Sequence, residues 1–275
     1  PNEEYFTRDL RPALSTFKDS RCLWISTPRG KGNYLYNYYL RGSDQEYPDW
    51  GSALFTWRSN PLLSENDVKE ARRAVSRALF AQEYECEWTT TEAQIYESLD
   101  EGKHVGEYVG ERFSEVIAGL DVGYRDDNVF VVIGFDGKSY YVIDEYVSKE
   151  STTSELATRI QEKMEEWSID TIYIDSAAQQ LKADFAYDYD IYCENAVKSV
   201  NDGINYLQVL IEQNNLFFDT LGSSHCFSAM SSYRWNPNTE TPKPVHDWTS
   251  HPCDAIRYAI YTHSKMSNIS IYAHG

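Results

Sequence analysis

The stretch Val116-Ile-Ala-Gly-Leu-Asp121 sets the predicted fold. It is a short apolar run that ends in an acid, a pattern typical of a buried strand. Val129-Phe-Val-Val-Ile-Gly134 follows, then the pair Asp136-Gly137, and then Ser139-Tyr-Tyr-Val-Ile-Asp144. Because Asp-Gly between two apolar runs is a strong hairpin signal, we expect three antiparallel strands over these residues.

The segments after the hairpin alternate between helix and strand. An amphipathic helix is predicted over 153–167 and a short buried strand over 172–174. This order of elements is that of an RNase H-like α/β fold, a mixed central sheet flanked by helices. In that fold the first strand is central and the fourth lies beside it. The later predicted elements are helices over 177–186, 201–213, 227–233 and 252–263, strands over 190–193 and 216–218, and a loop over 236–244.

The residues before position 92 form a separate pattern. Ser64 caps a predicted helix that runs to about residue 80, with Asp67 three residues after the cap. No strong pattern follows this helix, so the expected domains are residues 1–92 and residues 93–275. The other elements predicted in the first domain are strands over 21–27 and 53–57, a loop over 28–33 and a helix over 34–40.

Three aspartates lie at the ends of these elements. Asp121 ends its apolar run, Asp175 ends Thr171-Ile-Tyr-Ile-Asp175, and Asp254 lies in His251-Pro-Cys-Asp254. Alone, each has a structural explanation: an Asx turn, a helix N-cap, or an acid at a helix start. Together, on this order of elements, they would meet at one edge of the sheet. Carboxylates suit Mg²⁺ and Mn²⁺, and two such ions can cleave phosphodiesters, so we predict a metal-dependent nuclease.

His251 is the fourth candidate site residue. It lies three residues before Asp254, so the two side chains share a face if the last helix begins that early. His251 would then bind the second ion or shuttle a proton, and the alternative is an ordinary loop histidine. The weaker candidates are His246 and Asp247 as neighbours of the site, and Asp144 and Glu145 as accessory ligands. Lys182 and Arg257 are candidate phosphate contacts, although a solvated helix face is favoured for Lys182, and 126–128 favours a turn.

The charge distribution limits how the protein meets DNA. The chain has 275 residues and a net charge of -18. Residues 93–275 hold 13 Lys and Arg against 29 Asp and Glu, whereas residues 1–92 hold 12 against 14. An acidic surface repels a phosphate backbone, so we expect weak DNA affinity and another module or partner that holds the substrate. The alternative is that the acid only keeps the surface soluble.

Other features exclude several classes of protein. No run of 18 apolar residues exists, so no transmembrane helix is expected, and the N-terminus lacks the features of a secretory signal. The chain has 5 cysteines and no C-x-x-C pair, which argues against a zinc site or a disulfide framework. It also lacks an initiator Met, so we expect a fragment or a processed product.

One stretch is similar to a phosphate-binding loop. Ser26-Thr-Pro-Arg-Gly-Lys-Gly32 does not match G-x-x-x-x-G-K-[ST], because Lys31 is followed by glycine. No other stretch supplies that motif. This chain alone is therefore not expected to hydrolyse ATP.

Taken in order, several segments resemble the large terminase subunits of tailed phages, which are DNA-packaging motors. The resemblance covers nearly the whole chain, and the order and spacing of its motifs are specific. The ATPase coupling region and the end of the ATPase domain are matched by Leu10-Arg-Pro-Ala-Leu-Ser15, Trp24-Ile-Ser-Thr-Pro-Arg-Gly30, Asn33-Tyr-Leu-Tyr36, Asn60-Pro61 and Phe80-Ala-Gln-Glu-Tyr84. The RNase H-like nuclease is matched by Ala118-Gly-Leu-Asp121, Tyr173-Ile-Asp175 and His251-Pro-Cys-Asp254-Ala-Ile-Arg-Tyr258.

The resemblance implies an endonuclease that cuts concatemeric double-stranded viral DNA into genome-length units. Asp121 would bridge two Mg²⁺ or Mn²⁺ ions, Asp175 and Asp254 would each complete one site, and His251 would assist. The implied partners are DNA, the portal protein, the small terminase subunit and the ATPase half of the motor, in the cytoplasm of the infected bacterial host. The family's Walker A and Walker B segments lie upstream, so residues 1–92 would be the C-terminal remainder of its ATPase domain.

Two alternatives stay open. An RNase H-like resolvase or transposase uses similar acids, but it does not explain Ser26-Thr-Pro-Arg-Gly30. A non-catalytic docking module for the portal or motor would fit the acidity, and it would show no saturable effect of Mn²⁺. Clustered carboxylates repel one another, so in a nuclease we expect metal binding to stabilise the fold.

Overall fold

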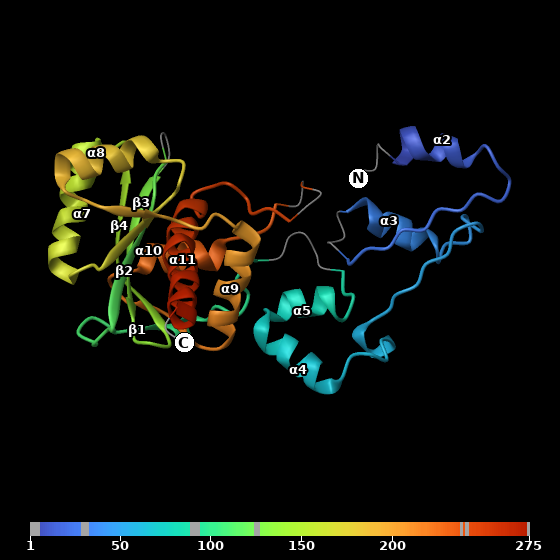
Figure 1. Cartoon of the computed structure of the whole chain (residues 1–275), viewed down its shortest axis with the longest axis horizontal. Helices are drawn as coiled ribbons and strands as arrows, with labels where there is room; N and C mark the ends of the chain where they lie inside the picture. Colours follow the sequence, from blue (N-terminus) through green and yellow to red (C-terminus); the bar gives the residue numbers. More distant parts are fainter. Residues whose placement is uncertain are drawn as a thin grey trace.

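The computed structural model describes residues 6–28, 33–88, 94–123, 127–236, 239 and 242–273. Figure 1 shows a body of sheet and helices on one side and an N-terminal segment of short helices and extended chain on the other. The body contains a seven-stranded sheet in the order β1-β7-β4-β3-β2-β5-β6. The strands are β1 Val105–Gly106, β2 Glu115–Asp121, β3 Asp127–Phe135, β4 Tyr140–Lys149, β5 Thr171–Ile174, β6 Cys193–Asn195 and β7 Leu216–Asp219.

The antiparallel centre of the sheet is the predicted three-stranded unit. β2 pairs with β3 over its whole length, and β3 pairs with β4. The turn between β3 and β4 forms because the Asp136 carboxylate accepts hydrogen bonds from the backbone N–H groups of Lys138 (2.8 Å) and Ser139 (2.7 Å). Gly137 adopts a φ of +99°, which glycine tolerates without strain. The Asp-Gly hairpin signal is confirmed.

The parallel strands set the edge at which the acids meet. β5 lies beside β2 and runs parallel to it, as the predicted order requires. Leu120 of β2 is paired with Ile174 of β5. The next residues along the two strands are Asp121 and Asp175, so these two acids leave the sheet side by side.

Helices cover both faces of the sheet (Figure 1). Alternate residues of β3 divide between two cores: Val129 and Val131 lie in the core under α9, α10 and α11, whereas Phe130 and Val132 lie in the core under α7. The helices of the body are α6 Glu101–His104, α7 Thr153–Trp167, α8 Gln179–Tyr189, α9 Val200–Glu212, α10 Ser224–Ser232 and α11 Ser250–Ala273. The mixed α/β prediction is confirmed, although α11 is longer at both ends than the predicted 252–263.

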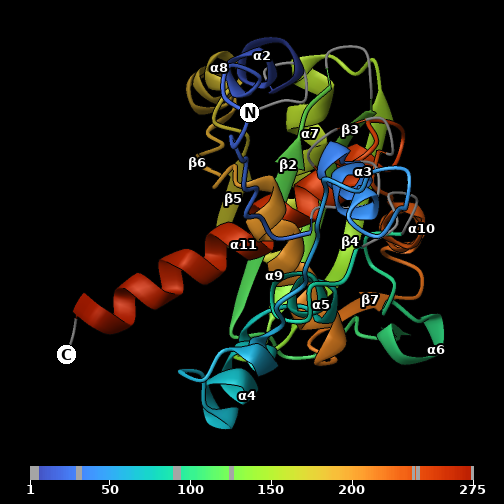
Figure 2. The ribbon, with the colours of Figure 1, turned by 90° about the vertical axis from the view of Figure 1, so that its right-hand side faces the viewer.

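Helix α11 packs directly on the central strand. A Cβ atom at Gly119 of β2 would lie 2.0 Å from the carbonyl oxygen of Ala255, so only glycine permits this approach. The first half of α11 is buried against the sheet, and Figure 2 shows the helix continuing beyond the body toward the C-terminus. The close approach brings the start of α11 over the end of β2.

The far edge of the sheet holds two elements that the sequence did not predict, α6 and β1. β1 pairs with β7, and the buried Asp219 of β7 fixes the chain around it. The Asp219 carboxylate accepts four backbone hydrogen bonds, from Tyr108 (2.8 Å), Val109 (3.3 Å), Leu221 (3.0 Å) and Gly222 (3.0 Å). Elements of two and four residues are too short to leave a periodic pattern.

The predictions for the N-terminal segment are only partly right. The predicted strands over 21–27 and 53–57 are wrong: both stretches are irregular, and Leu23 and Ile25 are 82% and 88% exposed. A strand needs a ladder of backbone hydrogen bonds to a neighbouring strand, and among the described residues before 88 the second stretch has only isolated bonds, such as that from Trp57 N–H to the carbonyl of Tyr84 at 2.8 Å. The helix after Ser64 is confirmed with its capping box, but it ends at Ala74, because Ser76 caps a second helix. The elements described are η1 Phe6–Leu10, α2 Arg11–Leu14, α3 Tyr34–Arg41, η2 Trp57–Ser59, α4 Glu65–Ala74 and α5 Arg77–Glu83.

Hydrogen bonds join the N-terminal segment to helix α9 of the body. The carboxylate of Glu212, at the end of α9, accepts hydrogen bonds from the backbone N–H of Arg77 at 3.0 Å, and the amide oxygen of Asn205 accepts one from Ser76 N–H at 3.0 Å. Part of the predicted 28–33 loop and the proposed boundary at residue 92 lie outside the described residues, so the division into 1–92 and 93–275 stays a prediction. Within the described part of the chain, no helix is long and apolar enough to cross a membrane.

Candidate active site

Asp121 and His251 form a buried pair where β2 meets α11. Asp121 is the last residue of β2, and its pairing with Val129 turns its side chain toward the α11 face of the sheet. His251 lies on the first turn of α11. Its Nδ1 donates to Oδ2 of Asp121 at 2.7 Å, and the two residues are 9% and 8% exposed. The helix therefore begins early enough for His251 to face the site, as the spacing to Asp254 suggested.

Asp254 follows one turn later on α11 and is held by Arg257. The guanidinium of Arg257 donates from Nε (3.2 Å) and Nη2 (2.8 Å) to Oδ1 of Asp254, and Arg257 is 2% exposed. Burial raises the pKa of Asp254; the charge of Arg257 opposes that rise, and the nearby carboxylate of Asp121 adds to it. Asp254 and Asp121 are therefore close enough to repel each other.

Asp175 comes directly after β5 and has three different partners. It accepts hydrogen bonds from the backbone N–H of Ala177 (2.7 Å) and from the hydroxyl of Tyr258 (3.3 Å). The ammonium of Lys198 lies 2.5 Å from its Oδ1. Burial works against ionisation of Asp175, but the bonds from Lys198 and Ala177 prevail and hold its pKa below the usual range.

The pKa of Tyr258, on α11, responds to all three acids. Burial raises the pKa of its hydroxyl, and the charges of Asp121, Asp254 and Asp175 raise it further. The hydroxyl donates to Asp175 at 3.3 Å, and Tyr258 lies on the same helix as Asp254 and as His251, which binds Asp121. The structure thus gathers Asp121, Asp175, Asp254 and His251 at one edge of the sheet.

The gathered side chains are not arranged as a closed metal site. Among the residues that the structure describes, no three His, Cys, Asp or Glu side chains form a group that could hold a metal ion. Each carboxylate is instead engaged by its own partner: His251, Arg257 or Lys198. The donor set is still of the kind that suits a divalent cation, since it consists of carboxylates near one edge of the sheet. Binding would require exchange of these partners for metal.

Comparison with known proteins places this arrangement in a family. Residues 118–262 match the model of the terminase RNaseH-like domain. The chain belongs to this family. The matched range contains Asp121, Asp175, His251 and Asp254, together with the sheet edge and the part of α11 that carry them.

Individual terminases are similar over most of the chain. The large terminase subunit of Escherichia phage T5 is 39% identical in an alignment of 274 residues. The alignment covers 94% of this chain and 62% of that protein. The large terminase of a thermophilic bacteriophage has the same fold, with a TM-score of 0.69 and 20% identity over 92% of this chain and 65% of that one. The P22 large terminase nuclease domain matches with a TM-score of 0.54 and 17% identity, over 63% of this chain and 93% of that domain.

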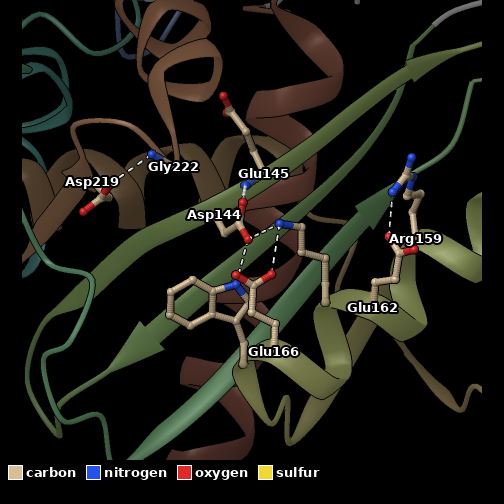
Figure 3. Close-up of polar contacts among 9 residues, drawn as sticks. Asp144, Glu145, Arg159, Glu162, Glu166, Asp219 and Gly222 are labelled. Carbon is tan, nitrogen blue, oxygen red and sulfur yellow. Dashed lines mark hydrogen bonds and ion pairs between the residues drawn. The ribbon is translucent and has the colours of Figure 1, made fainter.

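Asp144 and Glu145, the two predicted accessory ligands, bind structural partners instead. Figure 3 shows both acids and the contacts of Asp144. Asp144 forms an ion pair with Lys163 of α7 and accepts a hydrogen bond from Nε1 of Trp167 at 2.7 Å. Glu145 caps α10, since its carboxylate accepts from the backbone N–H groups of His225 (2.8 Å) and Cys226 (2.7 Å). The accessory-ligand prediction for Asp144 and Glu145 therefore finds no support in this geometry.

Of the two candidates just before α11, Asp247 has a structural role and His246 lies near His251. Asp247 accepts hydrogen bonds from the backbone N–H and the hydroxyl of Thr249 at 3.0 and 2.5 Å, which positions the start of α11. The ring of His246 lies 5.6 Å from that of His251. His246 and Asp254 also line an open hollow of about 400 Å³. This hollow gives solvent a route to Asp254.

One cation of the site was missed from the sequence. Lys182, for which the sequence favours a solvated helix face over a phosphate contact, donates to the amide oxygen of Asn195 at 2.7 Å, and Arg257 binds Asp254. Lys198 was not considered, although it follows β6, the next parallel strand after β5. Its position three residues past a strand end is the signal that could have found it. In the predicted turn, Asp126 lies outside the described residues, and Asp127 forms an ion pair with Lys149.

Proposed function

We propose that this chain is the metal-dependent endonuclease part of a large terminase, which cuts concatemeric double-stranded viral DNA during genome packaging. The observation that carries the proposal is that Asp121 and Asp175 leave two neighbouring parallel strands at one edge of the sheet, where α11, which carries Asp254, contacts both of them through His251 and Tyr258. The family match supports a terminase nuclease role. Two-metal hydrolysis is the chemistry to which three such acids on an RNase H-like sheet are suited.

Each site residue has a distinct role in this proposal. Asp121, at the end of the central strand β2, would hold the metal together with Asp175 and Asp254. Bound Mg²⁺ or Mn²⁺ ions would supply an activated water and stabilise the leaving 3′ oxygen. His251 holds Asp121 through Nδ1, and its imidazole is placed to move a proton at the site. Arg257 positions Asp254 through its two hydrogen bonds.

Substrate capture is assigned to other parts of the motor. The net charge of -18 opposes autonomous binding to DNA. The chain spans 62% of the length of its T5 relative. The remaining motor parts, an ATPase half, the portal protein and the small terminase subunit, would present the DNA in the cytoplasm of the infected bacterial host.

Cleavage of supercoiled plasmid tests the proposal. The protein should nick and linearise plasmid with Mn²⁺ or Mg²⁺ and not with EDTA. Asp121→Asn should reduce the rate by more than about 100-fold, the upper range for loss of a group that merely orients a metal ligand. The exposed Asp188 of α8 provides a matched control, and Asp188→Asn should cut at the normal rate. Metal-independent cutting, or an active Asp121→Asn protein, would contradict the proposal; no cutting at high enzyme concentration would favour a docking role.

A further inference from the structure

The loop after β6 delivers Lys198 to the edge of the sheet where the acids gather. β6 runs parallel to β5, so both strands end at this edge. The loop is pinned on two sides: Ala196 N–H donates to the carbonyl of Ile174 at 2.8 Å, and Val197 N–H donates to the hydroxyl of Thr262 at 2.9 Å. The position of the Lys198 backbone is therefore fixed next to Asp175, and only its side chain has freedom to move.

The cations that hold Asp175 and Asp254 differ in how easily they can leave. The side chain of Arg257 is 3% exposed, and its departure from Asp254 would leave a charge buried without compensation. The side chain of Lys198 is 49% exposed, so water can solvate its ammonium as soon as it leaves Asp175. Of these two ion pairs, only the one with Lys198 can open without leaving a buried cation that has no partner.

The ammonium of Lys198 and a divalent ion would compete for the carboxylate of Asp175. Oδ1 of Asp175 faces Lys198 at 2.5 Å, and a divalent ion bound to that oxygen would repel a positive charge at such a distance. The displaced ammonium would stay near the site, because the pinned loop limits its reach. A DNA phosphate entering the site would meet a cation that no longer has a carboxylate partner.

We propose that Lys198 is an exchangeable counter-ion that holds Asp175 in the metal-free protein, gives up Oδ1 when metal enters, and then binds a phosphate of the DNA. Lys198 is thus a positioning residue, and the proposal rests on the metal-dependent nuclease proposed above. Metal and DNA each favour the released side chain, so each raises the affinity for the other. Free protein would load metal poorly and would load it well on DNA.

The test measures Mn²⁺ binding to the full chain without DNA, by calorimetry or by the free-Mn²⁺ EPR signal. Lys198→Met should bind Mn²⁺ about two- to fivefold more tightly than the unmodified protein, the range that an exposed ion pair allows. Lys198→Gln, which keeps a donor without the charge, should behave in the same way. Lys198→Arg keeps the charge and should bind with the original affinity. Lys182→Met is the matched control, because Lys182 contacts an amide and no carboxylate.

A second measurement follows the released side chain. Plasmid cleavage at saturating Mn²⁺ should show a higher KM for DNA with Lys198→Met and a nearly unchanged KM with Lys198→Arg. If the unmodified protein binds Mn²⁺ saturably and Lys198→Met binds it equally or less tightly, this inference is wrong and the proposed function stands. If the unmodified protein shows no saturable Mn²⁺ binding, the metal-dependent function itself fails. Thermal unfolding in EDTA verifies that each variant is folded before its affinity is compared.

Discussion

At the scale of single residues, the three carboxylates of the candidate site are chemically different. Asp121 faces an imidazole, Asp254 a buried guanidinium and Asp175 a half-exposed ammonium. Their pKa values respond accordingly: burial raises that of Asp254, whereas that of Asp175 is lowered by Lys198 and a backbone N–H despite burial. Removal of each acid should therefore affect stability in its own way.

Asp254→Asn and Asp175→Asn should differ in stability when metal is absent. The first change leaves Arg257 buried without a carboxylate, and we expect a loss of about 3 kcal/mol in the free energy of unfolding, although one costly buried carboxylate charge is removed as well. The second change leaves Lys198 free to be solvated, and we expect a change below about 1 kcal/mol. Urea unfolding in EDTA measures both. Equal losses would show that Lys198 is held as firmly as Arg257.

The sequence predicted the acids of the site and missed most of their partners. Asp121 and Asp175 were predictable because each follows an apolar strand, and parallel neighbours end at one edge. The partnership of Arg257 with Asp254 depends on burial, which a pattern of residue types does not reveal. Asp144 and Glu145 also follow an apolar run, yet they serve α7 and α10. A strand-end acid is thus a signal of position, and its partners decide its role.

At the scale of elements, the crossing of α11 over β2 fixes the site. Gly119→Ala would place a methyl group 2.0 Å from the carbonyl oxygen of Ala255. The helix would have to shift, and we expect a loss of about 1–3 kcal/mol in stability, as overpacked cores show. Plasmid cleavage should fall too, because His251 and Asp254 move with α11. Gly51→Ala is the control, since its new methyl group would meet nothing within 4 Å. Normal cleavage by Gly119→Ala would show that the helix position is not critical.

The β1–β7 edge should be sensitive to acid through Asp219. Burial opposes ionisation of Asp219, but the backbone N–H groups around it prevail and hold its pKa below the usual 3.8. Its contribution to stability is therefore present above pH 3.8 and is lost as the pH falls through the lower folded-state value. Asp219→Asn presents an amide N–H to these donors and should lose about 2 kcal/mol at pH 7.

Urea unfolding of Asp219→Asn and the unmodified protein at pH 7, 5 and 3 checks this pH dependence. The difference between the two proteins should be constant from pH 7 to 5 and should shrink as the pH falls below 3.8. A difference that grows toward low pH would mean that Asp219 is protonated in the folded protein.

At the scale of the whole molecule, the two halves of the chain differ in how far sequence predicts structure. The elements of the sheet body were predictable because their neighbours lie within the same chain: β2, β3 and β4 pair with one another, and β5 pairs with β2. The stretches over 21–27 and 53–57 have the apolar composition of strands, yet neither forms a strand ladder with the described residues. Composition alone does not make a strand when no neighbouring strand is present to pair with it.

The hydrogen bonds between Glu212 and the backbone of Arg77 join the N-terminal segment to helix α9 of the body. Helix α9 carries Glu212 at its end and Gly203 near its start, where a Cβ atom would lie 2.7 Å from the side chain of Arg257. α9 therefore contacts the N-terminal segment through Asn205 and Glu212, and it contacts the support of Asp254 through Gly203. A displacement of the N-terminal segment would therefore act on α9, which rests directly against the side chain that holds Asp254.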